Sequence, residues 1–216
     1  EQHIKREKAT SNICTAQALL ATMAGFYAVY HGPEGIRTIA ERIHSIAVFL
    51  EKSINRLGYK QVNAQYFDTL RFALPDTISA QQIRTIALSK EVNLRYFKNG
   101  DVGMSIDETT DITAVNVLLS IFAIAAGRDW EKASDVPMAS SISAEMKRQS
   151  TYLTHEVFNK YHTETEMMRY IKRLDRKDIS LAHSMISLGS CTMKLNAAAE
   201  MLPLSRPEFM NMHPLV

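Results

Sequence analysis

Apolar residues recur every three or four positions through most of the first 57 residues, and this spacing limits the possible folds more than any other feature. Such spacing places the apolar side chains on one face of a helix. One stripe covers residues 13–30, a second covers 36–57, and His31-Gly32-Pro33 lies between them. Glycine commonly ends a helix, and proline suits the first turn of the next one. The pattern predicts two helices that form a helical hairpin.

The apolar period changes to two after Lys60. Leu70, Phe72 and Leu74 alternate with more polar residues, which indicates a strand with one buried face, and Pro75 ends it. Residues 79–82, Ser-Ala-Gln-Gln, form a capping box that predicts a helix to about Lys90.

A β-hairpin and an apolar helix are expected next. Residues 92–96 and 102–106 alternate as strands, and Asn99-Gly100 supplies a hairpin turn between them. Residues 109–111, Thr-Thr-Asp, can cap the apolar helix that ends at Gly127. These elements predict a two-layer α/β unit, in α+β arrangement, with helices on one face of a small, largely antiparallel sheet.

Periodicity fades over residues 128–157, which we interpret as a linker. A second capping box, Thr163-Glu-Thr-Glu166, then opens a helix that carries Met167, Ile171 and Leu174. Basic residues near its end complement the helix dipole. The chain therefore gains a mainly helical C-terminal extension.

Residues 181–196 combine small, hydrogen-bonding residues with a single cation. Ser190, Cys191 and Thr192 follow Gly189 and precede Lys194, and Asn196 can cap a following helix. A glycine- and hydroxyl-rich loop before a helix start is suited to hold an anionic group. The other interpretation is a structural turn whose side chains bond their own backbone.

Composition excludes several classes of protein. The net charge is +2 with charges interspersed, so nothing favours binding to nucleic acid or to an anionic membrane. The most apolar segment, residues 115–126, is shorter than the ~20 residues that a membrane-spanning helix needs. Cys14 and Cys191 lie far apart and the histidines are widely spaced, so we expect neither a metal site nor a disulfide, and a reducing setting.

Three segments resemble the glycine cleavage system P-protein family of pyridoxal-phosphate enzymes. They are residues 1–21, residues 158–186, and SMISLGSCTMKLN at 184–196, which is similar to the family's SMIPLGSCTMKLN with Ser187 in place of the proline. The resemblance spans essentially the whole chain. It implies that the chain is an internal piece of a longer protein.

The resemblance also implies a division of the chain. Residues 1–127 would be a small α/β domain that closes the N-terminal half of the parent enzyme, as the small C-terminal domain of a fold-type-I pyridoxal-phosphate transferase does. Residues 128–157 would be the linker, and residues 158–216 would begin the C-terminal catalytic half.

The function implied by the resemblance is that of glycine dehydrogenase (decarboxylating), an aminomethyl-transferring oxidoreductase. The parent, expected to be a dimer, would use pyridoxal phosphate to decarboxylate glycine and pass the aminomethyl group to the lipoyl arm of H-protein. The setting would be the cytoplasm in a bacterium or the mitochondrial matrix in a eukaryote.

The family's Schiff-base lysine directly follows a histidine, and no His-Lys pair occurs in this sequence. We therefore expect no catalytic residue in the chain, no activity and no pyridoxal phosphate held by it alone. Ser190, Cys191, Thr192 and Lys194 remain candidates to contact cofactor or substrate. Two alternatives stay open: a non-catalytic helical interaction or dimerisation module, and a small α/β enzyme with Ser190 or Cys191 as nucleophile.

Overall fold

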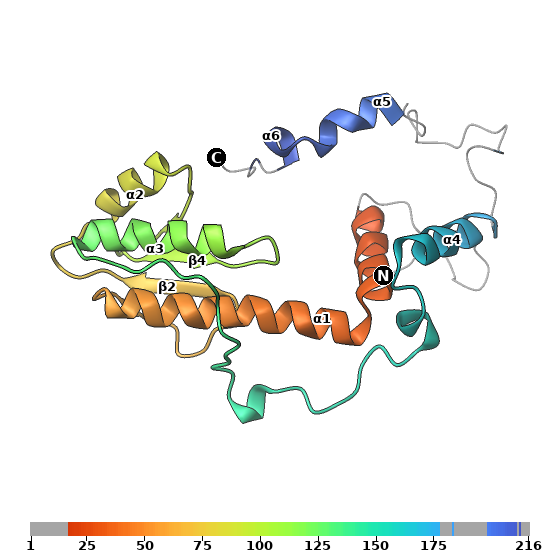
Figure 1. The fold of residues 1–216 in the computed structure, drawn as a ribbon, viewed down its shortest axis with the longest axis horizontal. Coiled ribbons are helices and arrows are strands. Elements are labelled where there is room, and N and C mark those ends of the chain that lie inside the picture. Colours follow the sequence, from red (N-terminus) through yellow and green to blue (C-terminus); the bar gives the residue numbers. More distant parts are fainter. Residues whose placement is uncertain (1–16, 178–182, 184–197, 211, 213–216) are drawn as a thin grey trace. The chain divides into compact units, whose positions relative to one another are not determined.

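The computed structural model describes residues 17–177, 183, 198–210 and 212 (Figure 1). The chain forms two compact units. One consists of Pro33–Tyr152, and the other combines Glu1–Gly32 with Leu153–Val216. The domain boundaries expected at 127 and 157 concern the halves of a longer protein, so they stay a prediction.

The 33–152 unit is built on a four-stranded antiparallel sheet. Its strands are β1 (Lys60–Gln61), β2 (Thr69–Ala73), β3 (Arg95–Tyr96) and β4 (Val102–Ser105), in the order β1-β2-β4-β3. In the pairing of the two central strands, Leu70 of β2 lies opposite Met104 of β4. The small antiparallel sheet expected from the alternating residues is confirmed, although β3 is shorter than expected.

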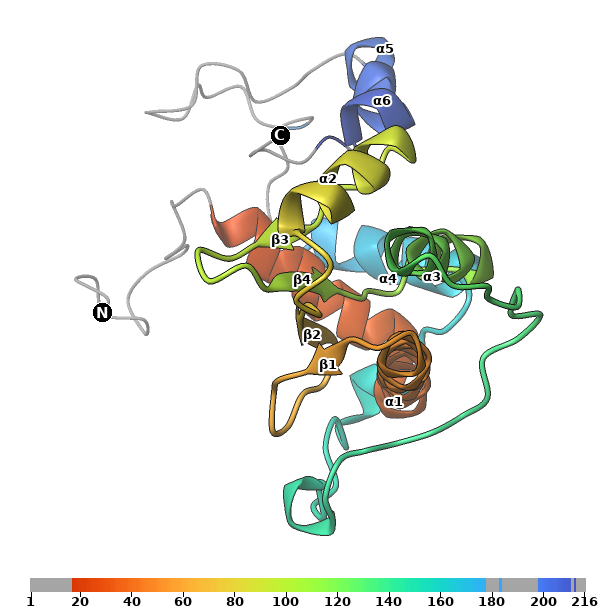
Figure 2. The same ribbon diagram turned by 90° about the vertical axis from the view of Figure 1, so that its left-hand side faces the viewer.

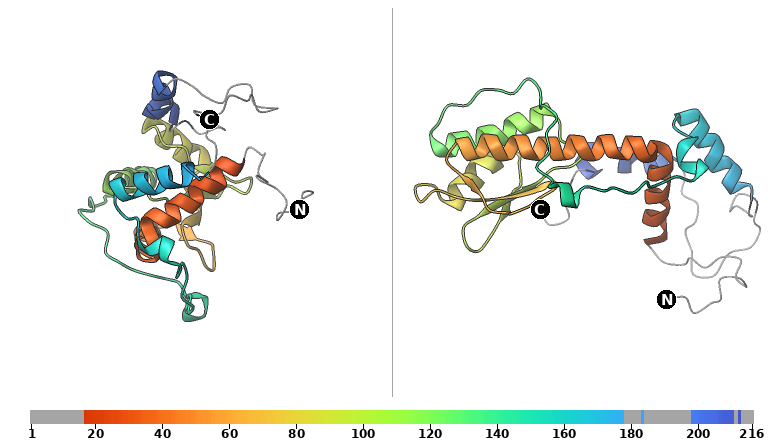
Figure 3. Two further views of the ribbon diagram at one scale, coloured as in Figure 1. Left: turned by 90° about the vertical axis from the view of Figure 1, so that its right-hand side faces the viewer. Right: turned by 90° about the horizontal axis from the view of Figure 1, so that it is seen from below.

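Helices cover one face of this sheet. The part of α1 (Gln17–Arg56) that follows Pro33 and α3 (Ile112–Ala126) lie on the same side of the strands (Figure 2). Helix α2 (Ala80–Ser89) contributes buried Ile83 to the same core. Figure 3 shows the same layers from two further directions. The two-layer α/β arrangement expected for this part of the chain is therefore confirmed.

The core lies between the helices and the inner sheet face. Leu70 and Phe72 of β2, together with Val102 of β4, are completely buried. The Phe122 ring of α3 packs at 5.0 Å from Tyr59 and at 5.7 Å from Phe72, between centroids. Aromatic pairs at such distances add to the free energy gained by burial.

The helix caps form as the sequence predicts. The Ser79 hydroxyl accepts a hydrogen bond from the Gln82 N–H at the start of α2, and the Asp111 carboxylate accepts one from the Ala114 N–H at the start of α3. Gly127 ends α3 in the left-handed conformation, with φ of 61°. These contacts satisfy backbone groups that a bare helix end leaves unpaired.

The two helices expected over residues 13–57 are confirmed for the described residues. The helical range Gln17–Arg56 joins them across a kink at Gly32, the one residue of this range with non-helical angles, φ 62° and ψ −178°. The first helix belongs to one compact unit and the second to the other, so their arrangement as a hairpin stays a prediction. Leu19, Leu20 and Met23 stay 66%, 67% and 57% exposed, outside the core.

The second unit is mainly helical. Besides residues up to Gly32 it contains α4 (Glu164–Asp175), α5 (Ala198–Met201), α6 (Pro207–Met210) and the 3₁₀ turns Glu156–Asn159 and Leu202–Ser205. His162 Nδ1 lies 2.7 Å from the Tyr30 carbonyl oxygen, and Phe26 meets Tyr170 edge-on. Among the described residues, no helix has the length and apolar character needed to cross a membrane.

Candidate functional site

The four predicted site residues, Ser190, Cys191, Thr192 and Lys194, lie outside the described residues. Their role as contacts to a cofactor or substrate therefore stays a prediction. The continuous described stretch 17–177 ends a short distance before this loop in sequence. The residues just upstream provide the candidate site that the structure does describe.

A shallow cleft of about 510 Å³ lies beside α4 in the second unit. Its walls come from the 155–161 segment and from one side of α4. The lining residues are His155, Glu156, Val157, Lys160, Tyr161, Tyr170, Arg173, Leu174 and Lys177. Basic and aromatic side chains thus predominate along its wall.

Two tyrosines and an arginine form the wall of the cleft. The rings of Tyr161 and Tyr170 stack at 4.3 Å between centroids, with 11° between their planes. Arg173 Cζ lies 5.4 Å from the Tyr161 centroid and 5.3 Å from that of Tyr170, and the guanidinium donates to the Tyr161 hydroxyl. A cation at these distances is attracted to the ring faces. Arg173 is therefore fixed by the wall that it helps to form.

The lysine in this wall is held in its charged form. Lys160 Nζ donates to Glu156 Oε1 at 2.8 Å. This hydrogen bond raises the pKa of Lys160 and lowers that of Glu156. A lysine nucleophile needs the opposite shift, since only the neutral amine attacks a carbonyl. The cleft can attract an anion, but Lys160 is not arranged to form a covalent bond with one.

Thr163 caps the start of α4, as the sequence predicts. The Thr163 hydroxyl accepts a hydrogen bond from the Glu166 N–H at 3.3 Å and donates to Glu166 Oε2 at 3.0 Å. Glu164 and Glu166 lie in the first turn, and Lys172 and Arg173 lie in the last. Both sets of charges oppose the helix dipole and stabilise α4.

Replacing Thr163 by alanine removes this cap, and we expect α4 to lose about 1 kcal/mol of stability. Increased amide exchange over Glu164–Asp175 would measure the loss. Thr165→Ala makes the same chemical change inside the helix, where alanine is the better helix former. Equal loosening in both variants would show that the cap is not responsible.

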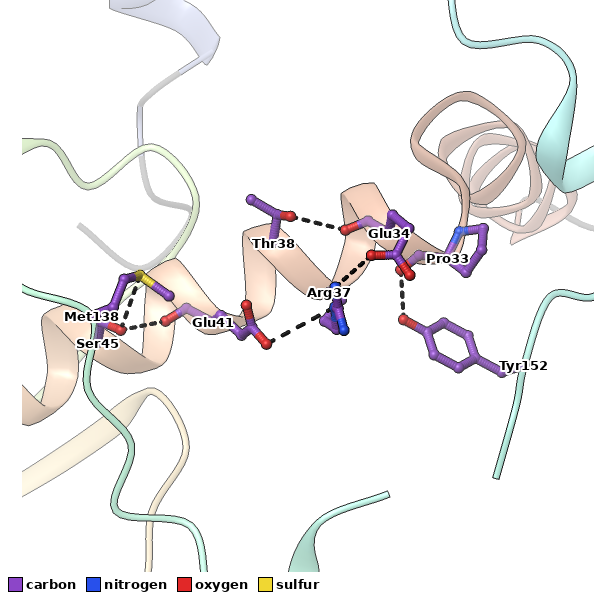
Figure 4. A network of polar contacts seen from close by, with 8 residues as sticks. All are labelled: Pro33, Glu34, Arg37, Thr38, Glu41, Ser45, Met138 and Tyr152. Atoms are coloured by element: carbon purple, nitrogen blue, oxygen red, sulfur yellow. Dashed lines mark hydrogen bonds and ion pairs between the residues drawn. The ribbon is translucent and has the colours of Figure 1, made fainter. Parts of the chain in front are cut away.

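Sequence reasoning missed a buried polar pair on α1, His44 and Ser45. The Ser45 hydroxyl donates to the Glu41 carbonyl at 2.7 Å (Figure 4). It also accepts a hydrogen bond from the Ala139 N–H at 3.0 Å. The Ser141 backbone N–H donates a hydrogen bond to Nε2 of His44, at 2.9 Å. The pair thus attaches part of the predicted linker to the helix. Its signal in the sequence was two polar residues between Ile43 and Ile46 on an apolar stripe.

The same linker segment returns to the start of the 33–152 unit. The Tyr152 hydroxyl donates to the Pro33 carbonyl at 2.6 Å, and the next residue, Glu34, forms an ion pair with Arg37 (Figure 4). Within the described residues, no group of three or more metal-ligating side chains is close enough together to hold a metal ion.

These elements together define a two-layer α/β protein with a helical extension and a basic cleft. Residues 1–122 match the model of the glycine cleavage system P-protein family. The chain therefore belongs to the glycine cleavage system P-protein family.

Similar curated proteins carry one name, glycine dehydrogenase (decarboxylating). The chain is 83% identical over 216 residues to that of Bacteroides fragilis (strain YCH46), which covers all of this chain and 23% of the relative. It is 53% identical over 214 residues to that of Flavobacterium johnsoniae, covering 99% of this chain and 22% of the relative. It is 53% identical over 219 residues to that of Shewanella amazonensis, with the same two shares. The chain thus spans less than a quarter of the length of these relatives.

Proposed function

We propose that the chain is a non-catalytic part of a glycine dehydrogenase (decarboxylating). The observation that carries the proposal is the 83% identity to a protein of that name along all 216 residues, over 23% of its length. Differences at about one position in six over 216 aligned residues are compatible with the same fold and role. In this proposal, the residues that make and break bonds belong to the remaining length of the parent protein.

The reaction of the parent would be the decarboxylation of glycine, with transfer of the aminomethyl group to the lipoyl arm of H-protein. Pyridoxal phosphate, when bound, would supply the electron sink for this chemistry. Residues 1–127 would form the small C-terminal domain of a fold-type-I enzyme, residues 128–157 a linker and residues 158–216 the start of the catalytic half, and the parent would be a dimer. The named relatives are bacterial, which supports a cytoplasmic setting.

The described residues do not fit pyridoxal phosphate as a covalently held group. The cleft beside α4 contains Lys160 and Lys177, and both side chains are exposed. Glu156 also holds Lys160 in its charged form. A Schiff-base lysine needs a neutral amine, which burial favours. We therefore assign no catalytic step to the described residues.

The role proposed for Ser190, Cys191, Thr192 and Lys194 is to contact an anionic group in a pocket completed by other parts of the parent. Hydroxyls, backbone N–H groups and one lysine are suitable donors for a carboxylate or a phosphate. Lys194 would act there as a cation.

Loss of all cofactor on desalting tests this proposal. The 216-residue chain is mixed with pyridoxal phosphate, desalted and examined for visible absorbance. We expect none to remain, in the chain or in a Lys194→Ala variant. Absorbance that survives desalting in the unaltered chain and disappears in Lys194→Ala would contradict the proposal, because it would identify Lys194 as the covalent anchor.

A second function, a helical interaction module, is favoured by the exposed apolar residues of α1. Leu19, Leu20 and Met23 present a stripe that a soluble helix would normally bury. A size that increases with concentration on a sizing column, and that stays constant after Leu20→Glu, would support this role for the isolated chain. A monomer at every concentration would argue against it.

A further inference from the structure

We propose that His44 is a proton-sensitive latch, which in its neutral form holds Ser141 against α1 and on protonation releases it. We call residues 138–141 the strap. The strap lies almost a hundred positions from His44 in sequence, and the two are joined through the imidazole ring. This proposal does not depend on the function proposed above.

The hydrogen bonds of the ring define its protonation state. Nδ1 lies 2.7 Å from the Phe67 carbonyl oxygen, and Nε2 lies 2.9 Å from the Ser141 backbone nitrogen. A carbonyl can only accept, and a backbone N–H can only donate. The imidazole therefore donates through Nδ1–H and accepts at Nε2, which is possible only for the neutral ring.

The imidazole ring of His44 is buried among aromatic side chains. His44 is 2% exposed, and its ring stacks on Phe67 at 5.6 Å with 3° between the planes. The centroid of the Tyr66 ring lies 5.8 Å from that of the His44 ring. The ring is therefore enclosed by aromatic side chains and has little contact with water.

Charged residues of both signs lie on the helix that carries the ring. Within eight positions of His44 on α1 they are Arg37, Glu41, Arg42, Glu51 and Lys52; the 62–68 loop adds Tyr66 and Asp68, and the strap has no ionisable residue. The Tyr66 hydroxyl donates to Glu51 Oε2 at 2.9 Å, and burial raises the pKa of Tyr66 to about 12, so this phenol stays neutral. The hydrogen bonds of His44 go to Phe67 and Ser141, and not to any of these carboxylates.

Protonation would place a second N–H at Nε2, directly opposite the Ser141 N–H. Two donors cannot share a hydrogen bond, so the Ser141 N–H would lose its acceptor on the ring. Ser141 is exposed, so water can take the place of the ring once the contact opens. The Ser141 hydroxyl, at 3.4 Å from Nε2, is too distant to replace a bond of 2.9 Å fully. Ala139 is bonded to Ser45 instead, so that end of the strap would stay attached.

Amide exchange of the isotopically labelled 216-residue chain tests the latch. The Ala133 N–H donates to Asn116 Oδ1 at 2.9 Å, a bond with no titrating group, and serves as the internal reference. The protection of Ser141 relative to Ala133 is measured from about pH 8 to about pH 5, which spans the ordinary titration of histidine. We expect the ratio to fall at least about tenfold, since release is linked to the uptake of one proton.

His44→Gln is the matched control, because a glutamine amide can accept from the Ser141 N–H without titrating. Its ratio should not change with pH. A constant ratio in the unaltered chain, or an equal fall in His44→Gln, would overturn the proposal. If the variant does not fold, the NMR signals of the His44 ring in the unaltered chain provide the test instead. They must titrate with the same midpoint as the Ser141 amide shift, and different midpoints would also overturn the latch.

Discussion

Replacing Phe122 by alanine is expected to destabilise the 33–152 unit by about 3–5 kcal/mol. The side chain is completely buried at the centre of α3 and contacts the rings of Tyr59 and Phe72. Alanine would leave a cavity bounded by aromatic rings, which cannot close around it without moving β2. Denaturant unfolding of the 216-residue chain, followed by circular dichroism, measures the change in unfolding free energy.

Ile124→Ala provides the comparison on the same helix. Ile124 is 53% exposed, so its truncation removes little buried area and should change the unfolding free energy by no more than about 0.5–1 kcal/mol. Similar losses in the two variants would show that the core is not centred on Phe122. The Tyr59 hydroxyl bonds the Phe122 carbonyl at 2.8 Å, and this backbone contact is available to both variants.

Gly32→Ala is expected to destabilise the unit that contains it by about 2–4 kcal/mol. Gly32 has φ 62° and ψ −178°, a region open almost only to glycine. A Cβ added there would lie 2.7 Å from the Phe158 carbonyl oxygen and 2.8 Å from His162 Cε1. Because one of these atoms is backbone, the contact cannot be relieved by rotating a side chain. Amide exchange across Glu164–Asp175 would report the loss.

Gly25→Ala is a control with the opposite sign. Gly25 lies in the same helix, and a Cβ built there meets nothing within 4 Å. Alanine at such a position should stabilise the helix by about 0.5–1 kcal/mol. Destabilisation by both substitutions would indicate that α1 tolerates no side chain on this stretch, and that the conformation of Gly32 is not the cause.

The local parts of the fold could be predicted from the sequence. Ser79, Asp111, Thr163 and Gly127 mark helix ends through contacts with residues three or four positions away, and all four form as expected. The Asn99-Gly100 turn is equally local, with Gly100 at φ 91°. Such signals depend on nearby residues alone, so no tertiary information is needed to interpret them.

The nonlocal parts could not be predicted. The Gly32-Pro33 pair predicts where one helix ends and the next begins, but the angle between the two helices depends on contacts far from the pair in sequence. The strap was interpreted as linker because its partners, His44 and Ser45, are more than ninety positions away. Val92 has strand-like spacing but follows Glu91 at φ 59°, which leaves only Arg95–Tyr96 in the sheet. The loop with Ser190 and Lys194 lies outside the described residues, so its site stays a prediction.

The central claim is that the chain is a working but non-catalytic part of a glycine dehydrogenase (decarboxylating). Replacing the matching segment of a full-length relative with this chain tests it most directly. The 216 aligned residues of the Bacteroides fragilis relative are replaced with this sequence, and release of carbon dioxide from carboxyl-labelled glycine is measured with lipoylated H-protein present. We expect the chimera to retain activity within a few-fold of the relative, and the isolated chain to release none. A folded but inactive chimera, or turnover by the isolated chain, would contradict the account.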